Sequence, residues 1–234
     1  MSRIWIGTSG YNYPEWKGSF YPEKMKPADM LAYYGGRFDA VEINYTFYRM
    51  PNAKTIDGWM ADTPQDFRFV LKAPRRLTHE RRLKEYGDTL AVFVRLASGL
   101  DSRLGPFLFQ LPPNLKKDLP RLEAFLDDLP DTAKAAFEFR HESWFDEDVL
   151  AALKARGAAL CAADSEKISS PVVQTAAFSY FRLRDEGYQD ADIAAWTEKV
   201  KAASVSGEVY VFFKHEESGK GPAFAKQMRN LLIS

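Results

Sequence analysis

Short runs of branched and aromatic residues recur along the chain and alternate with longer amphipathic stretches. This alternation is typical of repeated strand–helix units, because a buried strand reads as a continuous apolar run and a surface helix as a 3.6-residue pattern. The runs predict eight strands, at residues 4–7, 40–43, 68–71, 106–110, 135–139, 158–162, 178–182 and 209–213.

The stretches between the runs predict helices at residues 28–35, 53–61, 82–98, 119–128, 147–155, 190–203 and 222–232. Pro27, Asp118 and Asp146 stand where three of these helices would begin, with Asp146 as a capping side chain, and Gly157 stands where one would end. The sixth connection, residues 165–177, is short and rich in serine, so its helix is predicted to be weak or missing.

Eight parallel strands with covering helices predict an α/β fold, a TIM-barrel-like (β/α)8 closed parallel barrel. An open, doubly wound sheet is the structural alternative. Closure is favoured because polar residues follow nearly every strand, where a barrel places its site. The chain has no linker or low-complexity tract, so residues 1–234 are predicted to form a single domain.

Composition narrows the function classes. With 32 basic and 32 acidic residues the formal net charge is zero, which argues against a surface shaped wholly for nucleic acid or an anionic membrane. The single cysteine, Cys161, cannot form an internal disulfide and is interpreted as a packed apolar residue rather than a nucleophile. No apolar run has membrane-spanning length and the start shows no signal-peptide core, so we expect a cytoplasmic protein.

The polar residues at the strand ends are the candidate chemistry. Glu42 lies near the end of one run and Glu138 near the end of another, so both carboxylates would face one pocket at the mouth of a barrel. Three interpretations stay open: an ion network with arginines, general acid–base catalysis by the pair, or a metal site. Only three histidines occur, so a zinc cluster is discounted. A single Mg²⁺ or Mn²⁺ ion on Glu42, Glu138 and Asp164 is the metal alternative, and no cofactor is predicted.

Two basic features have competing interpretations. Lys72 closes the apolar run FRFVLK, where we expect a carboxylate partner, with a Schiff-base amine as the alternative. Arg75 and Arg76 open a basic segment that reaches to residue 84. They could clamp a phosphate or carboxylate, or form a solvated helix start.

The aromatic stretch GTSGYNYPEWKGSFYP follows the first predicted strand and is therefore the first loop at the mouth. Trp16, Phe20 and Tyr21 are expected to pack over the mouth. Tyr11 and Tyr13, nearest the strand, are expected to face a ligand with their hydroxyl groups.

This stretch, together with FDAVEINYTFYRMP, FRFVLKAPRRLTH, LGPFLFQLPP and FEFRHESW, resembles the motifs of the DUF72 family, also called YecE-like proteins, over about residues 3–164. The resemblance implies a TIM-barrel-like fold and no assigned reaction. It marks as motif residues Glu42, Asn44, Tyr48, Lys72, His79, Gln110, Glu138, Arg140, His141 and Trp144.

The sequence departs from the family pattern in three places. Tyr11 stands where the first motif usually has tryptophan, YFRLRDEG replaces a typical YvRfHG, and FFKHEE replaces yFNND. The last two changes lie beyond strands seven and eight, so the pocket is expected to differ more than the fold. They introduce Arg184, Asp185, Lys214, His215 and Glu216.

The leading hypothesis is an enzyme of hydrolase or isomerase type that acts on a small polar or anionic molecule. Its catalytic candidates are Glu42, Glu138, Arg140, His141 and Lys72. Its ligand-binding candidates are Tyr11, Tyr13, Asn44, Tyr48, Arg75, His79, Gln110, Trp144, Asp164, Arg182, Arg184, Lys214 and His215. The alternatives are a nucleic-acid-binding or nuclease-like barrel, which the neutral charge does not favour, and a non-catalytic binding scaffold.

Overall fold

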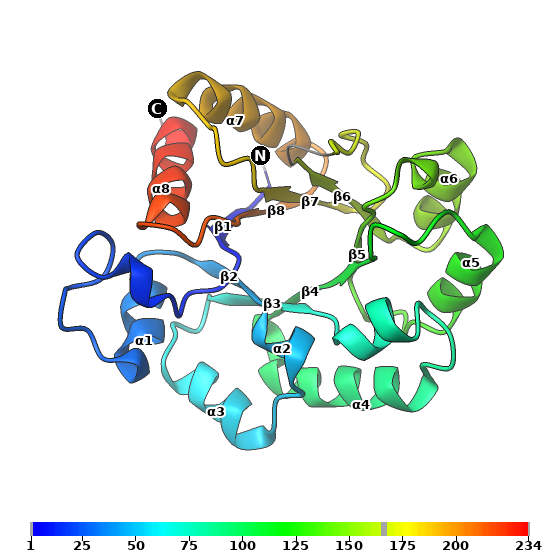
Figure 1. Ribbon diagram of the computed structural model, residues 1–234, viewed down its shortest axis with the longest axis horizontal. Helices are drawn as coiled ribbons and strands as arrows, with labels where there is room; N and C mark the ends of the chain where they lie inside the picture. Colours follow the sequence, from blue (N-terminus) through cyan, green and yellow to red (C-terminus); the bar gives the residue numbers. More distant parts are fainter. Residues whose placement is uncertain (1, 165–167, 234) are drawn as a thin grey trace.

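The structure is a computed structural model and describes residues 2–164 and 168–233. Eight parallel strands form a ring with the helices outside it, and Figure 1 shows this ring along its axis. The strand order is β1-β8-β7-β6-β5-β4-β3-β2. The predicted TIM-like barrel is confirmed. The strands are β1 (Ile4–Thr8), β2 (Ala40–Ile43), β3 (Arg68–Lys72), β4 (Leu104–Gln110), β5 (Ala135–Glu138), β6 (Ala159–Ala163), β7 (Phe178–Leu183) and β8 (Glu208–Phe213).

The helices lie close to the predicted ranges, with two exceptions described below. Their bounds are α1 (Met30–Gly35), α2 (Tyr45–Tyr48), α3 (Ala53–Ala61), α4 (Gly87–Ala97), α5 (Leu119–Asp127), α6 (Glu147–Ala155), α7 (Asp190–Ser204) and α8 (Lys220–Ile233). In the described residues none of these helices combines the length and the apolar character needed to cross a membrane. The part of the sixth connection that the structure describes, residues 168–177, contains no helix, as predicted.

Two helix predictions are corrected. The helix predicted at 82–98 begins only at Gly87, because Arg82, Leu83 and Glu85 adopt positive φ angles of 51°, 59° and 44°. That backbone leaves the helical region and lets Leu83 reach the core, where it is buried. The short helix α2 was not predicted, because four residues carry too little of a helical period to be recognised.

Of the two aspartates predicted to begin helices, Asp118 caps its helix and Asp146 does not. The Asp118 carboxylate accepts a hydrogen bond from the Arg121 amide (3.2 Å), as an N-cap does. Asp146 occupies the N-cap position of α6 without capping it, because its carboxylate binds Lys117 Nζ (2.7 Å) instead. Gly157 ends α6 with a φ of 61°, as its position predicts.

The interior of the barrel changes character along its axis. An apolar cluster of small and aromatic side chains fills the lower part, including Trp5, Val70, Leu108 and Tyr210. Because strand side chains alternate, the residue two positions further along each strand points to the same side. Val70 is thus followed on the inner face by Lys72, and Leu108 by Gln110. The upper end of the barrel interior is therefore polar.

The ring closes between β1 and β2 without a regular ladder in the described residues. A single parallel bridge joins Ser9 to Glu42, and the Gly10 amide donates to the Glu42 carbonyl (2.7 Å). Lower down, the strands approach so closely that a Cβ on Gly7 would lie 1.9 Å from the Ala40 carbonyl oxygen. We call this junction the β1–β2 seam.

Side chains from α1 and the loop after it complete the β1–β2 seam. The Tyr34 hydroxyl accepts from the Thr8 amide (2.8 Å) and donates to the Ala40 carbonyl (3.0 Å). The Asp39 carboxylate accepts from the Ile6 amide (3.1 Å). These groups satisfy buried backbone atoms that a strand ladder would otherwise pair.

Candidate functional site at the mouth of the barrel

A buried arginine lies between two carboxylates at the base of the mouth. Arg182 Nε donates to both oxygens of Glu42, at 3.0 and 3.1 Å, and Arg182 Nη1 donates to Glu138 Oε2 at 3.1 Å. All three side chains are at most 1% exposed. Charged groups tolerate such burial only when they are paired and hydrogen-bonded, and the single guanidinium provides this for both acids.

The remaining oxygen positions of the two carboxylates are also occupied. Glu42 accepts hydrogen bonds from Ser9 Oγ and the Tyr180 hydroxyl, each at 2.6 Å. Glu138 accepts from Gln110 Nε2 at 2.8 and 2.9 Å. Burial alone would raise the pKa of Glu138, but Arg182 and other cations near it bring that pKa below its ordinary value. Glu138 is therefore an ionised structural anion at neutral pH.

The arginine also occupies the place that a shared metal ion would need. A cation bound to both Glu42 and Glu138 would have to displace the Arg182 guanidinium from between them. Asp164, the third proposed oxygen ligand, accepts instead from the Tyr188 hydroxyl and from the Arg184 amide (2.9 Å). In residues 2–164 and 168–233 no cluster of three or more metal-ligating side chains occurs.

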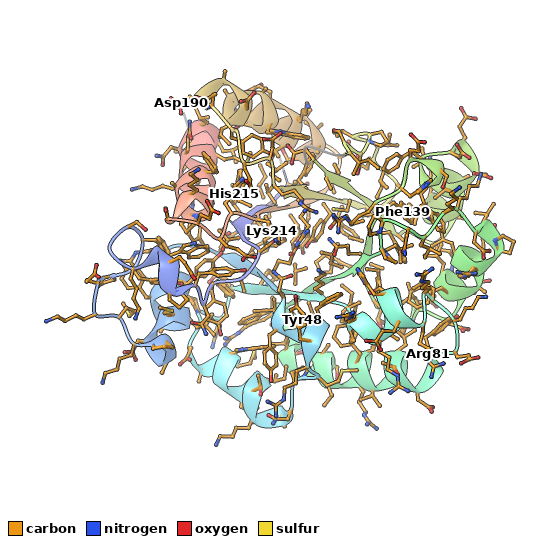
Figure 2. All side chains as sticks on the ribbon, viewed as in Figure 1. Tyr48, Arg81, Phe139, Asp190, Lys214 and His215 are labelled. Carbon is orange, nitrogen blue, oxygen red and sulfur yellow. The ribbon has the colours of Figure 1, made fainter. Side chains whose placement is uncertain are left out.

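Above this base lies a hollow of about 550 Å³ with a strongly basic lining. Six of its lining side chains are basic and one is acidic. Glu216, the acidic one, pairs with Lys214 (3.3 Å). The basic residues are Lys72, Arg75, Arg140, Arg182, Arg184 and Lys214, and the other lining residues are Tyr13, Asn44, Phe47, Tyr48, His79 and Gln110. In Figure 2, Lys214 and Tyr48 lie on opposite sides of the barrel centre.

Two buried polar atoms of lining residues have no hydrogen-bond partner within the described part of the chain. They are Arg182 Nη2, a donor, and Asn44 Oδ1, an acceptor. Since buried polar atoms are normally satisfied, each indicates a place where a bound molecule or water completes the bonding.

The basic walls shift the pKa values of two residues. Burial, together with the charges of Arg182 and Lys214, lowers the pKa of Lys72 to about 7, although Glu138 and Glu42 oppose the shift. Burial also lowers the pKa of His79 to about 4, helped by the charges of Lys72, Arg75 and Arg140. His79 is therefore neutral at pH 7, and Lys72 exchanges its proton in the physiological range.

The architecture has known counterparts. The family model described as "Protein of unknown function DUF72" matches residues 5–234. The chain belongs to the DUF72 family. A DUF72 family protein from Thermotoga maritima has a crystal structure that aligns with a TM-score of 0.90 at 28% identity, covering 99% of this chain and 100% of that one. One from Enterococcus faecalis aligns with a TM-score of 0.82 at 20% identity, covering 100% and 99%, which shows the shared fold alone.

Two curated DUF72 relatives carry no assigned activity in their names. UPF0759 protein YecE of Escherichia coli (strain K12) is 32% identical over 143 residues, covering 61% of this chain and 50% of that protein. UPF0759 protein YunF of Bacillus subtilis (strain 168) is 31% identical over 188 residues, covering 74% and 64%. The matches thus span about half to two thirds of the curated relatives' lengths.

Most of the residues singled out from the DUF72 motifs and strand ends converge on the hollow. Those that line it are Tyr13, Asn44, Tyr48, Lys72, Arg75, His79, Gln110, Arg140, Arg182, Arg184 and Lys214. Glu42 and Glu138 lie directly beneath, held by Arg182. Arg184 and Lys214, which come from two stretches expected to distinguish this pocket, both line it, as does Glu216 from the second stretch.

Besides Glu42 and Glu138, five residues predicted as site residues lie outside this lining. Trp144 is fully buried, donates to the Leu115 carbonyl and stacks on Phe139, so it belongs to the core. The remaining four have other contacts. His141 is hydrogen-bonded to Ser143 Oγ, and Asp164 accepts from the Tyr188 hydroxyl. His215 is hydrogen-bonded to the Asp185 carbonyl among aromatic rings near α8. Tyr11 lines a separate hollow beside Trp59. Figure 2 shows His215 farther from the barrel centre than Lys214.

The aromatic first loop packs partly against α1 and partly at the mouth. Phe20 and Tyr21 pack on Tyr33 of α1. Trp16 is buried and donates from Nε1 to the carbonyl of Glu216 (2.9 Å), a residue that lines the hollow. Tyr13 does line the hollow, but its hydroxyl donates to the Ser9 carbonyl (2.8 Å). The sequence placed this loop near the mouth, but it did not show which of the aromatic side chains would be buried and which would line the hollow.

The expected carboxylate partner of Lys72 is absent. No ion pair joins Lys72 to a carboxylate among the described residues, and its Nζ lies 4.1 Å from the centre of the Phe47 ring. Phe47 was not among the predicted site residues. Its position between Asn44 and Tyr48 in NYTFY was the available signal.

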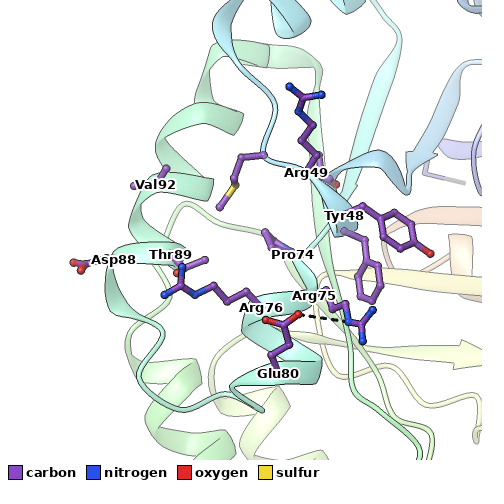
Figure 3. A pocket seen from close by; sticks show the side chains of 12 residues that line it. Tyr48, Arg49, Pro74, Arg75, Arg76, Glu80, Asp88, Thr89 and Val92 are labelled. Carbon is purple, nitrogen blue, oxygen red and sulfur yellow. Dashed lines mark ion pairs between the residues drawn. The ribbon is translucent and has the colours of Figure 1, made fainter.

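A second hollow, of about 670 Å³, adjoins the first across Phe47, Tyr48 and Arg75, which line both. Figure 3 shows Arg75 paired with Glu80 (3.6 Å) on this ridge, with Tyr48 beside it. Tyr48 is 79% exposed. The mouth therefore continues into an open groove on the side of α2 and α4.

Proposed function

We propose that this DUF72 barrel binds a small phosphorylated molecule in the hollow at the C-terminal ends of its strands. The observation that carries the proposal is the lining, in which six basic side chains face one acidic side chain although the whole chain has no net charge. A group with two negative charges and several acceptor oxygens is the natural complement of such a lining.

The position of two of the cations favours phosphate in particular. Arg184 follows β7 and Lys214 follows β8, and the loops after these two strands often form the phosphate site of a TIM barrel. Arg182 Nη2 adds an unpaired donor at the base of the same hollow. In this proposal Glu42 and Glu138 position Arg182, and any proton transfer falls to Lys72 and His79.

Binding of glycerol 3-phosphate measured by isothermal titration calorimetry at low ionic strength tests this proposal, with glycerol as the uncharged match. Arg140→Gln and Arg184→Gln should each weaken binding by about tenfold or more, because each removes a charge-assisted hydrogen bond. Arg81→Gln is the matched control. Arg81 pairs with Glu85 (2.7 Å) and is not in the lining, so its loss should leave the affinity unchanged.

Two results would contradict the proposal. One is equal heat from glycerol and glycerol 3-phosphate. The other is binding of a single-stranded oligonucleotide that falls steeply with salt while glycerol 3-phosphate gives no signal, which would favour the nucleic-acid alternative. That alternative has less support because the cations converge in a hollow instead of following a surface track.

A further inference from the structure

Lys72 is placed as a reactive amine. It is the last residue of β3, its side chain is 8% exposed, and it lines the same hollow as Arg140, Arg184 and Lys214. In residues 2–164 and 168–233 no carboxylate pairs with its Nζ, which contacts the Phe47 ring instead. An aromatic face attracts an ammonium far less than a carboxylate does, so little holds the proton on this amine.

The electrostatic surroundings of Lys72 agree with this placement. Burial and the nearby Arg182 lower its pKa to about 7, so a large share of the amine is neutral at physiological pH. A neutral amine is the nucleophilic form, whereas an exposed lysine is almost wholly protonated at that pH. Cys161, the other nucleophile inside the barrel, is fully buried and burial raises its pKa, so it cannot compete.

A neutral histidine lies across the same aromatic ring. The centres of the His79 and Phe47 rings are 5.0 Å apart, and Lys72 Nζ lies over the face of that Phe47 ring. His79 lines the hollow, and its Nδ1 is hydrogen-bonded to Thr78 Oγ1 (2.9 Å). In the tautomer whose Nδ1–H donates to this hydroxyl group, Nε2 is the basic nitrogen of the ring. This nitrogen is available to move a proton beside the amine.

We propose that Lys72 forms an imine with the carbonyl carbon of a phosphorylated aldehyde or ketone bound in this hollow. The inference rests on the proposed function, which supplies the phosphate site. Because the surrounding side chains are cationic, a protonated imine would be disfavoured there unless the ligand itself carried negative charge. The phosphate of the ligand provides that charge, which is why the carbonyl compound must be phosphorylated.

The covalent step balances without an oxidant or a cofactor. Lys72 Nζ forms a bond to the carbonyl carbon, and the carbonyl electron pair moves to its oxygen. His79 Nε2 takes one proton from the nitrogen and delivers it to that oxygen, which gives a neutral carbinolamine. A proton from solvent water then joins the hydroxyl group, which leaves as water as the nitrogen lone pair forms the carbon–nitrogen double bond of the protonated imine.

Borohydride trapping tests the inference. The protein is incubated with glyceraldehyde 3-phosphate at about pH 7.5 and reduced with sodium borohydride, and the adduct is located by peptide mass spectrometry. Lys72 should be labelled about tenfold or more faster than the exposed Lys54, because a far larger fraction of it is neutral. Glyceraldehyde without phosphate should label Lys72 no faster than Lys54, and the Lys72 rate should be half-maximal near pH 7.

Arg184→Gln gives the matched site variant, and Arg81→Gln the matched surface variant. Labelling of Lys72 should fall about tenfold in the first and stay unchanged in the second, because only Arg184 lines the hollow. Labelling of Lys214 in place of Lys72, or equal labelling by both aldehydes, would overturn the inference. Calorimetric binding of glycerol 3-phosphate without any Lys72 adduct would overturn it as well, while leaving the proposed phosphate site intact. Loss of both signals would remove both proposals.

Discussion

Arg182→Met should destabilise the fold by about 3–5 kcal/mol at pH 7, the cost typical of leaving buried charges without their partner. The substitution keeps a long side chain but removes the guanidinium that pairs with Glu42 and Glu138. Urea unfolding followed by circular dichroism measures the change. Arg184→Met is the matched control. Its 3.5 Å contact with Glu138 is the longer one and its side chain is 21% exposed, so we expect a loss of less than about 1 kcal/mol.

The pH dependence of the Arg182→Met defect distinguishes a charge effect from a packing effect. Without the arginine, burial should raise the pKa of Glu138 above its ordinary value of 4.5, so the cost of its buried charge is present at neutral pH and is lost as the pH falls. The stability gap to the parent protein should therefore narrow between pH 7 and pH 4. Restoration by the triple variant Glu42→Gln, Glu138→Gln, Arg182→Met would support the same cause, and a gap that is constant with pH would argue for lost packing.

Lys72→Met should stabilise the protein by an amount on the order of 5 kcal/mol near pH 7, since each unit of pKa difference corresponds to about 1.4 kcal/mol. The pKa of Lys72 is about 7 in the folded chain and 10.5 when it is exposed. Below pH 7 the amine is protonated in both states, and the folded state bears the whole cost of burying the charge. Between pH 7 and 10.5 the folded amine is neutral while the unfolded one is still protonated, so the cost shrinks as the pH rises and is absent once both are neutral.

The expected gain for Lys72→Met is therefore full at or below pH 7 and absent near pH 10.5, which urea unfolding at several pH values measures. Lys54→Met on the exposed face of α3 is the matched control and should change stability by less than about 0.5 kcal/mol at any pH. A Lys72→Met variant less stable than its parent at pH 7 would show that Lys72 is held by interactions that keep it charged. A site group whose removal stabilises the fold is a common sign of function.

The fold could be predicted from the sequence because each strand carries its own local signature. A run such as FRFVL is recognisable without knowing its neighbours, and polar residues after the runs place the site at one end of a barrel. The register that brings Gln110 opposite Glu138 follows once the strands are parallel and neighbouring. The late start of α4 was missed. Arg82 and Leu83 adopt positive φ angles, which residues with a side chain seldom do, and burial of Leu83 in the core accompanies this unusual backbone.

The sequence indicated which residues of the candidate site would lie close together, but not which of them would form ion pairs. The convergence of Lys72, Arg140 and Arg184 follows from strand ends, whereas the pairing of one arginine with two acids depends on which side chain reaches across the barrel. For the same reason the sequence suggested a partner for Lys72 that the structure does not give it. Pairing inside a barrel joins strands from opposite sides of the ring, and sequence distance carries no information about it.

From the contacts at the β1–β2 seam we expect closure of the ring to be a late event in folding. Every other pair of neighbouring strands is joined by a ladder that can grow residue by residue, whereas the seam depends on the docking of α1, which carries Tyr34, and on Asp39 after it. The strands from β2 round to β1 can thus assemble first as a curved open sheet, and the ring closes only when α1 packs against the β1–β2 seam. In kinetic terms, we expect the seam to form after the rate-limiting barrier, so that it governs how fast the barrel unfolds more than how fast it forms.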